Sequence, residues 1–333
     1  MSSEKLSHKE RLQAVLKGEK PDRIPVAFWR HWPVDDQDSE MLCHVTLEYQ
    51  KKFDMDWIKL TPSSSYTVTD WGAKHEYRGK AIGERDYTER VIKSVDDWNK
   101  IEVLDINKGR YGDTLKALEK VIKQRDKETP VLMTIFTASR IAGYMAGDDQ
   151  VPIYLRKYPE VMKRALDAIS ETTENFVKAC FDRGVDGIFL STFAASYEVM
   201  SEQEHDEFSR PYDLRVLDAA KDGWLNTIHL HGQYPMFDKV CDYPVSIINW
   251  HDRAAGPSIA EAAKKFPGMM ASGVEQFEVL HCQTPKEIEA QVEDAIKQAQ
   301  GRRLMISPGC TFPLTVPEGN LYTLRWSVDK FLP

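Results

Sequence analysis

The chain has 333 residues and a formal net charge of -8, with 42% hydrophobic and 29% charged residues. These values are ordinary for a folded globular protein and exclude a disordered or fibrous chain. The acidic balance and the lack of a basic run exclude nucleic acid as a partner, so we expect small molecules or proteins instead.

Apolar runs and cysteines indicate where the protein works. No stretch is long and apolar enough for a signal peptide or a membrane span. The five cysteines are odd in number and widely scattered, which argues against a disulfide framework and for a reducing compartment. We therefore expect a cytoplasmic protein with no membrane contact, in which any special cysteine is reactive or binds metal.

Short β-branched apolar runs alternate with longer stretches of helical period, an order that predicts βαβ units and a parallel sheet. The predicted strands are 24–28, 57–60, 131–134, 187–190, 227–230, 246–249, 269–272 and 304–306. About eight strands are what a closed (β/α)8 TIM barrel requires, and a chain of this length fits one barrel domain over 1–333.

Three stretches with helical spacing, 161–180, 202–220 and 285–299, predict helices of the outer ring. The stretch 61–106 is irregular and rich in Ser, Thr, Tyr and Gly. It predicts a long loop with a small hairpin over the barrel mouth.

Unusual residues follow the predicted strands, where barrel enzymes place their catalytic groups. Four of the nine histidines fall in these short segments, together with further polar and aromatic side chains. The set comprises Trp29, Arg30, His31, Arg140, His229, His231, Trp250, His251, Asp252, Glu275 and Cys310. We therefore expect an active site at the carboxyl ends of the strands.

Motifs spread over nearly the whole chain carry a family resemblance. They are 8–11 (HKER), 20–26 (KPDRIPV), 137–139 (TAS), 184–187 (GVDG), 208–212 (FSRPY) and 308–310 (PGC). In this order they resemble the uroporphyrinogen decarboxylase superfamily. The resemblance implies a TIM barrel and one of two activities: decarboxylation in the heme pathway, or methyl transfer from methylcobalamin to a thiol.

The decarboxylase features of the superfamily are only partly present. Those enzymes bind substrate carboxylates with arginines after the first strand, and Arg30 matches one of these. They also place an aspartate after the second strand and a histidine on the last loop. Here 59–63 (KLTPS) holds no carboxylate and 308–310 holds no histidine, so the chain is more similar to the methyltransferase branch.

The methyltransferase branch binds zinc with a His-x-Cys pair after the fifth strand and a cysteine on the last loop. The matching positions imply the ligands His229, His231 and Cys310, with His231 in place of the usual cysteine. Two residues apart on an extended segment, the histidines point to the same side, and a cysteine across the mouth can converge on them. Three protein ligands with an open position are typical of catalytic zinc.

Zinc would serve to activate a thiol. A free thiol has a pKa of about 8.5, and coordination deprotonates it into a nucleophile that can attack a methyl group on cobalt. The neutral His231 makes the site more positive than a thiolate ligand would. A zinc-bound water or an acceptor other than a simple thiol is therefore an alternative.

Further residues complete the expected site. His251 and Asp252 are candidates for general acid/base catalysis, and Glu275 for a proton carrier or fourth zinc ligand. The alternative for His251 and Asp252 is an ion-paired loop that only positions the mouth. A hydrogen-bonded histidine pair and a buried small cysteine are the corresponding alternatives to the metal site.

Substrate binding is expected from two arginines and two tryptophans. Arg30 and Arg140 can bind a carboxylate or phosphate bidentately, or be structural. Trp29 and Trp250 can wall a flat ligand such as a corrin, or belong to the core.

The sequence thus predicts a zinc-dependent methyltransferase-like enzyme, monomeric or homodimeric, with a corrinoid protein or methylcobalamin as methyl donor. One alternative is a metal-independent decarboxylase of an aromatic or pyrrolic acid, in which Arg30 and Arg140 bind carboxylate and His251 relays the proton. Another is a catalytically silent binding protein on the same fold. Bound zinc would favour the methyltransferase. Binding of a carboxylated aromatic molecule without metal would favour the decarboxylase. If the protein binds neither zinc nor such an acid, the catalytically silent binding protein is favoured.

Overall fold

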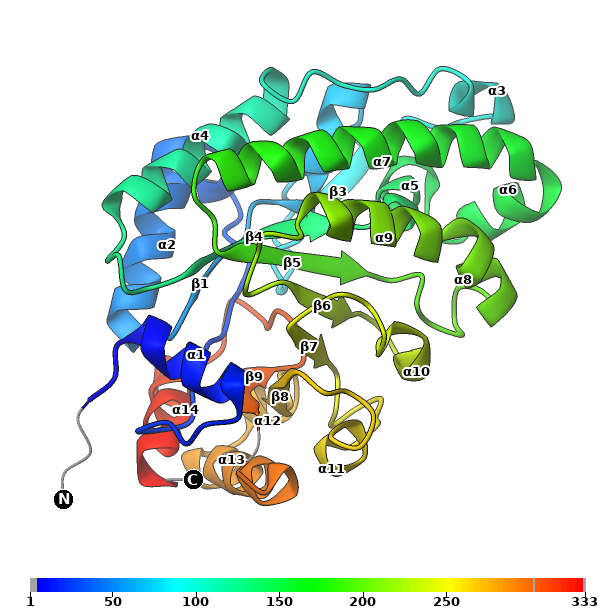
Figure 1. Ribbon diagram of the computed structural model, residues 1–333. Helices are drawn as coiled ribbons and strands as arrows, with labels where there is room; N and C mark the ends of the chain where they lie inside the picture. Colours follow the sequence, from blue (N-terminus) through cyan, green and yellow to red (C-terminus); the bar gives the residue numbers. More distant parts are fainter. Residues whose placement is uncertain (1–4, 302, 332–333) are drawn as a thin grey trace.

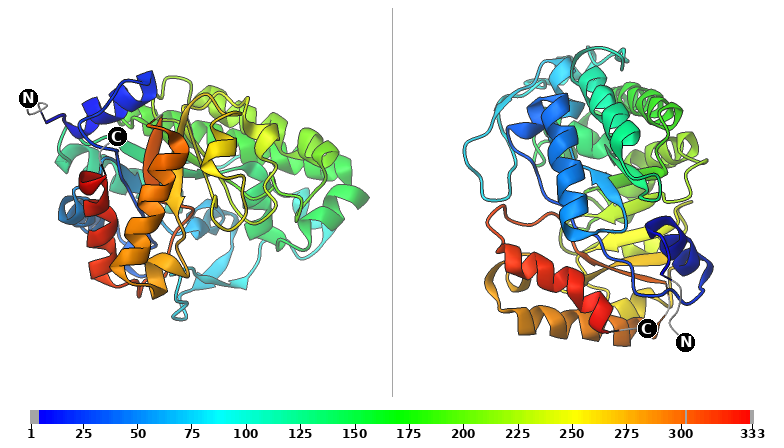
Figure 2. Two further views of the ribbon diagram at one scale, coloured as in Figure 1. Left: turned by 90° about the horizontal axis from the view of Figure 1, so that it is seen from below. Right: turned by 90° about the vertical axis from the view of Figure 1, so that its left-hand side faces the viewer.

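The computed structural model describes residues 5–301 and 303–331 and has a curled parallel sheet inside a layer of helices (Figures 1 and 2). Seven strands pair in the order β1-β4-β5-β6-β7-β8-β9. Their bounds are β1 Ile58–Leu60, β4 Val131–Phe136, β5 Gly187–Thr192, β6 Thr227–Leu230, β7 Ile247–Trp250, β8 Met269–Val274 and β9 Leu304–Pro308. All pairings in this sheet are parallel, and nearly every strand residue is buried, as expected for strands covered on both faces.

The helices lie mainly on the outer side of the curled sheet, as both views of Figure 2 show. The longer ones are α1 His8–Lys17, α2 Ser39–Phe53, α4 Gly109–Gln124, α5 Ala138–Ala146, α7 Pro159–Asp182, α9 Arg210–Ala219, α13 Pro285–Ala299 and α14 Glu318–Lys330. The shorter ones are α3 Val95–Trp98, α6 Val151–Lys157, α8 Glu202–Phe208, α10 Phe237–Val240, α11 Ile259–Ala262 and α12 Val279–Cys282. In the described part of the chain, none of them combines the length and apolar character needed to cross a bilayer.

Seven of the predicted strands are confirmed, with ends that differ from the prediction by no more than two residues. The predicted strand 24–28 is wrong as a strand, because it forms only an isolated bridge between Val26 and Ile306. Pro25 has no amide hydrogen, and the Val26 amide donates to the Asp56 carboxylate at 2.7 Å instead of to a neighbouring strand. The Phe28 amide points at a methionine sulfur. The ladder therefore cannot continue through this segment.

Segment 24–28 nevertheless lies between the two edges of the sheet. On one side, Ala27 donates its amide to Ile306 at 3.2 Å, and Ile306 donates to Pro25 at 2.9 Å. On the other side, the Asp56 amide donates to Val26 at 2.9 Å, just before β1 begins. The structure thus has a seven-stranded curled sheet with this irregular segment at its seam, in place of the predicted eight regular strands.

The helix predictions at 161–180 and 285–299 are confirmed by α7 and α13. The predicted helix 202–220 is instead two helices, α8 and α9, which are interrupted at Ser209. Pro211 lies in the first turn of α9, and its ring and missing amide hydrogen prevent α8 from continuing through it. Within 61–106, β2 Lys74–Glu76 and β3 Asp86–Glu89 form an antiparallel pair beside two 3-10 turns, Ser64–Thr67 and Thr69–Trp71. A third such turn spans Asp35–Gln37.

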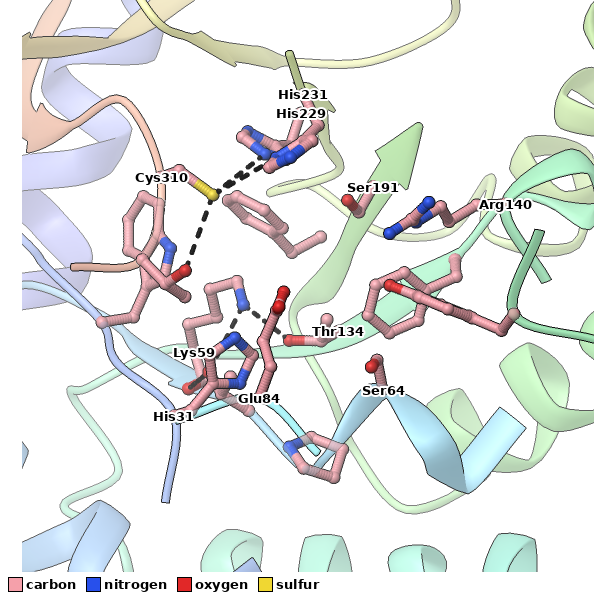
Figure 3. A pocket seen from close by; sticks show the side chains of 17 residues that line it. His31, Lys59, Ser64, Glu84, Thr134, Arg140, Ser191, His229, His231 and Cys310 are labelled. Carbon is pink, nitrogen blue, oxygen red and sulfur yellow. Dashed lines mark hydrogen bonds between the residues drawn. The ribbon is translucent and has the colours of Figure 1, made fainter. Parts of the chain in front are cut away.

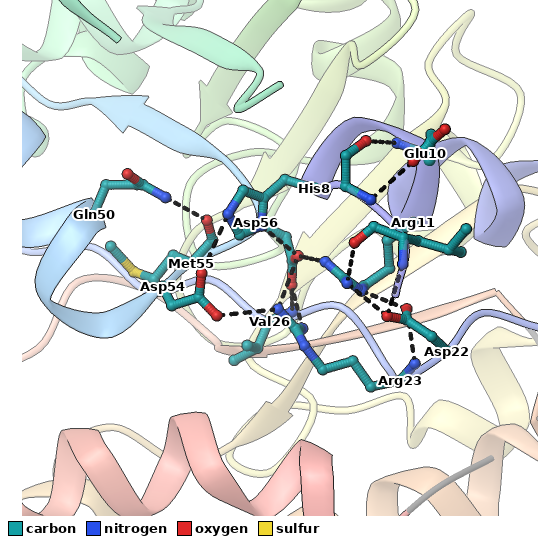
Figure 4. Close-up of polar contacts among 12 residues, drawn as sticks. His8, Glu10, Arg11, Asp22, Arg23, Val26, Gln50, Asp54, Met55 and Asp56 are labelled. Carbon is teal, nitrogen blue, oxygen red and sulfur yellow. Dashed lines mark hydrogen bonds and ion pairs between the residues drawn. The ribbon is translucent and has the colours of Figure 1, made fainter. Parts of the chain in front are cut away.

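A buried carboxylate ties the amino end of the sheet together (Figure 4). Asp56 is fully buried and accepts hydrogen bonds from Arg23 at 2.6 Å, Arg11 at 2.7 Å and His8 at 3.0 Å, besides that from Val26. Burial alone would raise the pKa of Asp56, but Arg23, His8 and Arg11 hold it well below its usual range. This Asp56 cluster joins α1, segment 24–28 and β1 at the end of the sheet opposite the strand carboxyl ends.

Candidate metal and substrate site

Four side chains that could bind a metal converge at the carboxyl ends of three strands. His229 lies in β6 and His231 just after it, His251 follows β7, and Cys310 follows β9. One ligand atom from each of the four lies within 4.8 Å of the others. The Cys310 Sγ is 3.5 Å from His229 Nε2 and 3.6 Å from His231 Nδ1, and Figure 3 shows the sulfur facing both rings. We call these four residues the His3Cys cluster.

The orientation of His229 is determined by a neighbour in β7. Asn249 pairs with His229 in the sheet register, and its amide nitrogen donates to the Ala271 carbonyl at 2.7 Å and the Pro308 carbonyl at 3.1 Å. Since carbonyls only accept, the Asn249 oxygen must face His229 Nδ1, at 2.6 Å, and this nitrogen must carry the hydrogen. His229 Nε2 therefore presents a lone pair to Cys310, as a metal ligand requires.

The electrostatics of the cluster suit a divalent cation. Burial, and then the neighbouring histidines, lower the pKa of His229 well below its ordinary value. Burial also lowers the pKa of His231 to about 3, so both rings are neutral at pH 7. Burial raises the pKa of the Cys310 thiol, although Thr311 and Lys59 oppose this. A buried cation would supply the charge that makes the thiolate stable there.

His251 contributes a buried atom that lacks a partner. Its Nε2 has no hydrogen-bond partner among the described residues, whereas its Nδ1 is 3.0 Å from the Gln276 side-chain amide. Burial lowers the pKa of His251, which Glu275 opposes. A neutral imidazole with an unsatisfied buried nitrogen beside two histidines and a cysteine fits a metal site better than a packed core.

A cavity of about 600 Å³, partly open to solvent, adjoins the cluster. His229, His231 and Cys310 line it on one side. The predicted residues Trp29 and Arg140 line it as well. Arg140 is paired with Asp148 at 2.6 Å, and its guanidinium stacks 4.2 Å from the centre of the Tyr144 ring. The structure thus brings these five residues together around one cavity.

Other predicted residues point elsewhere. Asp252 accepts hydrogen bonds from Ser272 at 2.6 Å and from the Gly273 amide at 3.1 Å, which holds the loop after β7 against β8. Glu275 accepts from the Phe277 and Val279 amides and so caps the turn before α12. Neither carboxylate lines the cavity.

Trp250 and Arg30 also lie outside this cavity. Trp250 is fully buried, with its ring 5.1 Å from Phe237 and its indole nitrogen donating to Pro257. Arg30 lines a smaller neighbouring cavity and stacks 4.5 Å from the centre of the Trp32 ring. The structure therefore places Trp250 in the core layer and Arg30 beside, not within, the larger cavity.

Several residues with a role at the site were not among the predicted functional residues. Lys59 in β1 lines the cavity, as does Glu84 from the segment between β2 and β3. His31, which was among the predicted strand-end residues, lines it too. Asn249 orients His229 from inside β7. A signal for Lys59 was available, because a charged residue between Ile58 and Leu60 is unusual in a buried strand. The role of Asn249 depends on the register between β6 and β7, so the residues around it in the sequence do not indicate that role.

The comparisons with known proteins establish the family. Residues 7–331 match the family model of uroporphyrinogen decarboxylase (URO-D), and the chain belongs to this family. The methylcobamide:CoM methyltransferase MtbA of Methanosarcina acetivorans is 22% identical over 94% of this chain and 95% of its own length. The uroporphyrinogen decarboxylase of Synechococcus sp. (strain CC9605) is 24% identical over 49% of this chain and 46% of its own. The resemblance inferred from the sequence motifs is confirmed.

Solved structures show the same fold. A methyltransferase from Methanosarcina mazei superposes with a TM-score of 0.86 at 18% identity, over 98% of this chain and 100% of its own. A B12-independent methionine synthase from Shewanella sp. W3-18-1 reaches a TM-score of 0.59 at 12% identity, over 93% of each chain. These two likenesses show that the chain shares the fold of both proteins.

Proposed function

We propose that this protein is a zinc-dependent methyltransferase that moves a methyl group between a corrinoid and a small acceptor, most simply a thiol. The observation that carries the proposal is the His3Cys cluster, in which a thiol and three neutral imidazoles converge beside a cavity. Full-length relatives named methylcobamide:CoM methyltransferases support methyl transfer as the reaction class.

His229 Nε2, His231 Nδ1 and Cys310 Sγ would hold the zinc, because nitrogen and sulfur ligands in a set of three or four are what zinc prefers. His251 Nε2, buried and without a described partner, is within reach of the fourth position. Bound zinc would lower the pKa of an acceptor thiol so that it is a thiolate at neutral pH. The chain itself orients His229 through Asn249 and excludes water from one side of the cluster by burial.

A corrinoid donor needs access to the cavity from the strand carboxyl ends. Large apolar side chains are exposed in loops on this side: Tyr197 after β5, Tyr234 after β6 and Phe277 after β8. The first two are neighbours, since the Tyr197 amide donates to the Tyr234 carbonyl at 3.1 Å. Exposed apolar residues beside a cavity support the docking of a corrinoid-carrying protein. The free state of all five cysteines supports a cytoplasmic location.

The decarboxylase alternative gains less from this geometry. It relied on Arg30 and Arg140 as a pair of carboxylate-binding groups and on His251 as proton relay. Arg30 faces a different cavity, Arg140 is already paired with Asp148, and His251 belongs to the His3Cys cluster. Asp252 and Glu275 hold loops in place, so we assign them structural roles.

Metal content of the purified protein tests the proposal directly. We expect about one zinc per chain in the wild type, and loss of zinc with retention of fold in Cys310→Ser and in His229→Ala. Cys282→Ser is the matched control, because Cys282 is exposed and far from the cluster in sequence, and it should keep its zinc. Stoichiometric zinc in Cys310→Ser would refute the ligand set.

The reaction is then tested by demethylation of methylcobalamin with a panel of thiols. We expect demethylation by the wild type and its loss in both ligand variants. A wild type that binds no metal even after zinc is supplied would overturn the proposal and redirect the search to carboxylated aromatic acids.

A further inference from the structure

A buried lysine in β1 faces the cavity without an acidic partner among the described residues. Lys59 lies in the middle of the strand, and only 9% of its surface is exposed. Its Nζ is 2.9 Å from Thr134 Oγ1 and 3.3 Å from Thr61 Oγ1. Each threonine already donates its hydroxyl hydrogen to a backbone carbonyl, Thr134 to that of Leu60 and Thr61 to that of Lys59. Both hydroxyls can therefore only accept hydrogen bonds from Nζ.

The number of acceptors around Nζ matches a neutral amine. An ammonium group has three hydrogens to donate, whereas a neutral amine has two hydrogens and one lone pair. The two threonines accept two hydrogens, and the other neighbours of Nζ are aromatic rings, with the centre of Phe189 at 4.5 Å and that of Trp29 at 5.6 Å. Such rings offset only part of the cost of burying a charge. In the neutral form both hydrogens are bonded, and the lone pair of Lys59 is left without a partner at the edge of the cavity (Figure 3).

The charges around Lys59 also disfavour an ammonium group. Burial lowers the pKa of Lys59 to about 7, although Cys310 opposes this. Arg140 is a second cation in the lining, and His31 is neutral, since burial and then the charge of Lys59 lower its pKa to about 4. Glu84 is the one carboxylate in the lining; it is exposed, and it forms no ion pair with Lys59 in the described part of the chain. A large part of Lys59 is therefore unprotonated at neutral pH.

We propose that Lys59 is a nucleophile that binds small apolar aldehydes covalently in this cavity, as an imine. The Nζ lone pair attacks the carbonyl carbon and forms a C–N bond, while the carbonyl oxygen takes up a proton that the nitrogen releases. The C–O bond then breaks, and the oxygen leaves as water with both hydrogens of the amine, which completes the C=N bond. Apolar aldehydes suit the lining, because four of its side chains are large aromatic rings: Trp29, Phe136, Tyr144 and Phe189. This activity lies beyond methyl transfer and needs no bound metal.

Reductive trapping of the imine tests the proposal. The chelator-treated wild type, Lys59→Met and Lys74→Met are incubated with benzaldehyde and cyanoborohydride at pH 7, and the benzylated lysines are identified by peptide mass spectrometry. Lys74→Met is the matched control, because it removes an exposed lysine that is paired with Glu89. We expect Lys59 to be labelled about a hundredfold faster than exposed lysines in the wild type and the control. The reason is that an exposed lysine, with a pKa of about 10.4, is almost entirely protonated at pH 7.

Two further comparisons separate a neutral nucleophile from a lysine that is merely accessible. From pH 7 to pH 10 the ratio of labelling at Lys59 to labelling at exposed lysines should fall about a hundredfold, because only the exposed lysines still lose protons in this range. Thr134→Asp places a carboxylate beside Nζ, which should hold Lys59 as an ammonium group and slow its labelling at pH 7 about tenfold or more. Circular dichroism checks that each variant is folded.

The outcomes distinguish this inference from the zinc proposal. Labelling of Lys59 that is no faster than that of exposed lysines, or a ratio that stays constant with pH, would overturn the inference. Equal total labelling of the wild type and Lys59→Met at pH 7 would also overturn it. Rapid labelling of Lys59 supports the inference even if the wild type holds no zinc. Stoichiometric zinc in a wild type whose Lys59 is not labelled supports the proposed function and refutes the nucleophile.

Discussion

At the scale of single residues, the site depends on side chains that orient others. Asn249 is the clearest case, because its amide nitrogen is committed to two backbone carbonyls and its oxygen therefore faces His229. This hydrogen bond leaves His229 Nε2 as the atom available to a metal. Residues that hydrogen-bond to a metal ligand, without touching the metal themselves, commonly contribute one to two orders of magnitude to metal affinity.

Substitution of Asn249 tests this orienting role. We expect Asn249→Leu to bind zinc about 10 to 100 times more weakly, because the His229 Nδ1 hydrogen loses its acceptor and the ring is free to turn. Asn249→Asp loses the donor to the Ala271 and Pro308 carbonyls but keeps an acceptor for His229, so it should bind zinc more tightly than Asn249→Leu. Competition with a chromogenic chelator measures both affinities. Equal weakening in the two variants would show that the effect comes from packing and not from ring orientation.

At the scale of elements, the Asp56 cluster holds together parts that regular pairing does not. Segment 24–28 is not a strand, yet it is anchored between β9 and the start of β1 by Asp56 and backbone hydrogen bonds. Helix α1 is fixed to the same point through Arg11 and His8. Where segment 24–28 closes the gap between β9 and β1, buried ion pairs of the Asp56 cluster thus take the place of regular hydrogen bonds between strands.

The anchoring of α1 should depend on pH through His8. Burial alone would lower the pKa of His8, but hydrogen bonds to Asp54 and Asp56 outweigh it and raise the pKa to about 9. A raised pKa means that the ion pair stabilises the fold fully below the unfolded-state value of 6.5 and is lost as pH rises through about 9.

Urea unfolding of the wild type and His8→Gln between pH 6 and pH 10 measures this contribution. The difference in unfolding free energy should be largest at pH 6 and fall by about 2 kcal/mol by pH 10. All other titrating groups are present in both the wild type and His8→Gln, so their contributions cancel in the difference between the two unfolding free energies. A difference that stays constant over this range would show that His8 is not charged in the folded protein.

At the scale of the whole molecule, the two ends of the sheet have separate tasks. The His3Cys cluster and the cavity lie at the strand carboxyl ends, whereas the Asp56 cluster lies at the amino ends. This division is typical of parallel α/β barrels, in which the loops after the strands carry function and the opposite face carries stability. Substitutions at the strand carboxyl ends should therefore change metal and substrate affinity more than they change the free energy of unfolding.

Removal of metal tests this separation. Dialysis against a chelator should lower the unfolding temperature by about 5–10 °C, because zinc binds the folded state alone. The far-UV circular dichroism at 25 °C should not change, since the ligands lie at or just beyond the carboxyl ends of the strands and the rest of the sheet is held by its own hydrogen bonds. Cys310→Ser should show no shift on the same treatment. Loss of secondary structure on chelation would mean that the metal holds the fold itself.

The sequence by itself determined the elements and the family. Strands such as 131–134 and 227–230, and helices such as 285–299, were predictable because hydrophobic periodicity is a local property of the chain. The order of strand-end residues also predicted that His229, His231 and Cys310 would share one mouth, since parallel strands present their carboxyl ends on the same side.

Only the tertiary structure decided which side chains meet. Alternation along β7 places one of Asn249 and Trp250 toward the cluster and the other toward the helices, but the periodicity alone does not say which. The register with β6 settles it, with Asn249 against His229 and Trp250 against Phe237. Lys59 and the break at segment 24–28 depend on partners such as Thr134 and Asp56. Such contacts join residues far apart in the chain, and no local pattern records them.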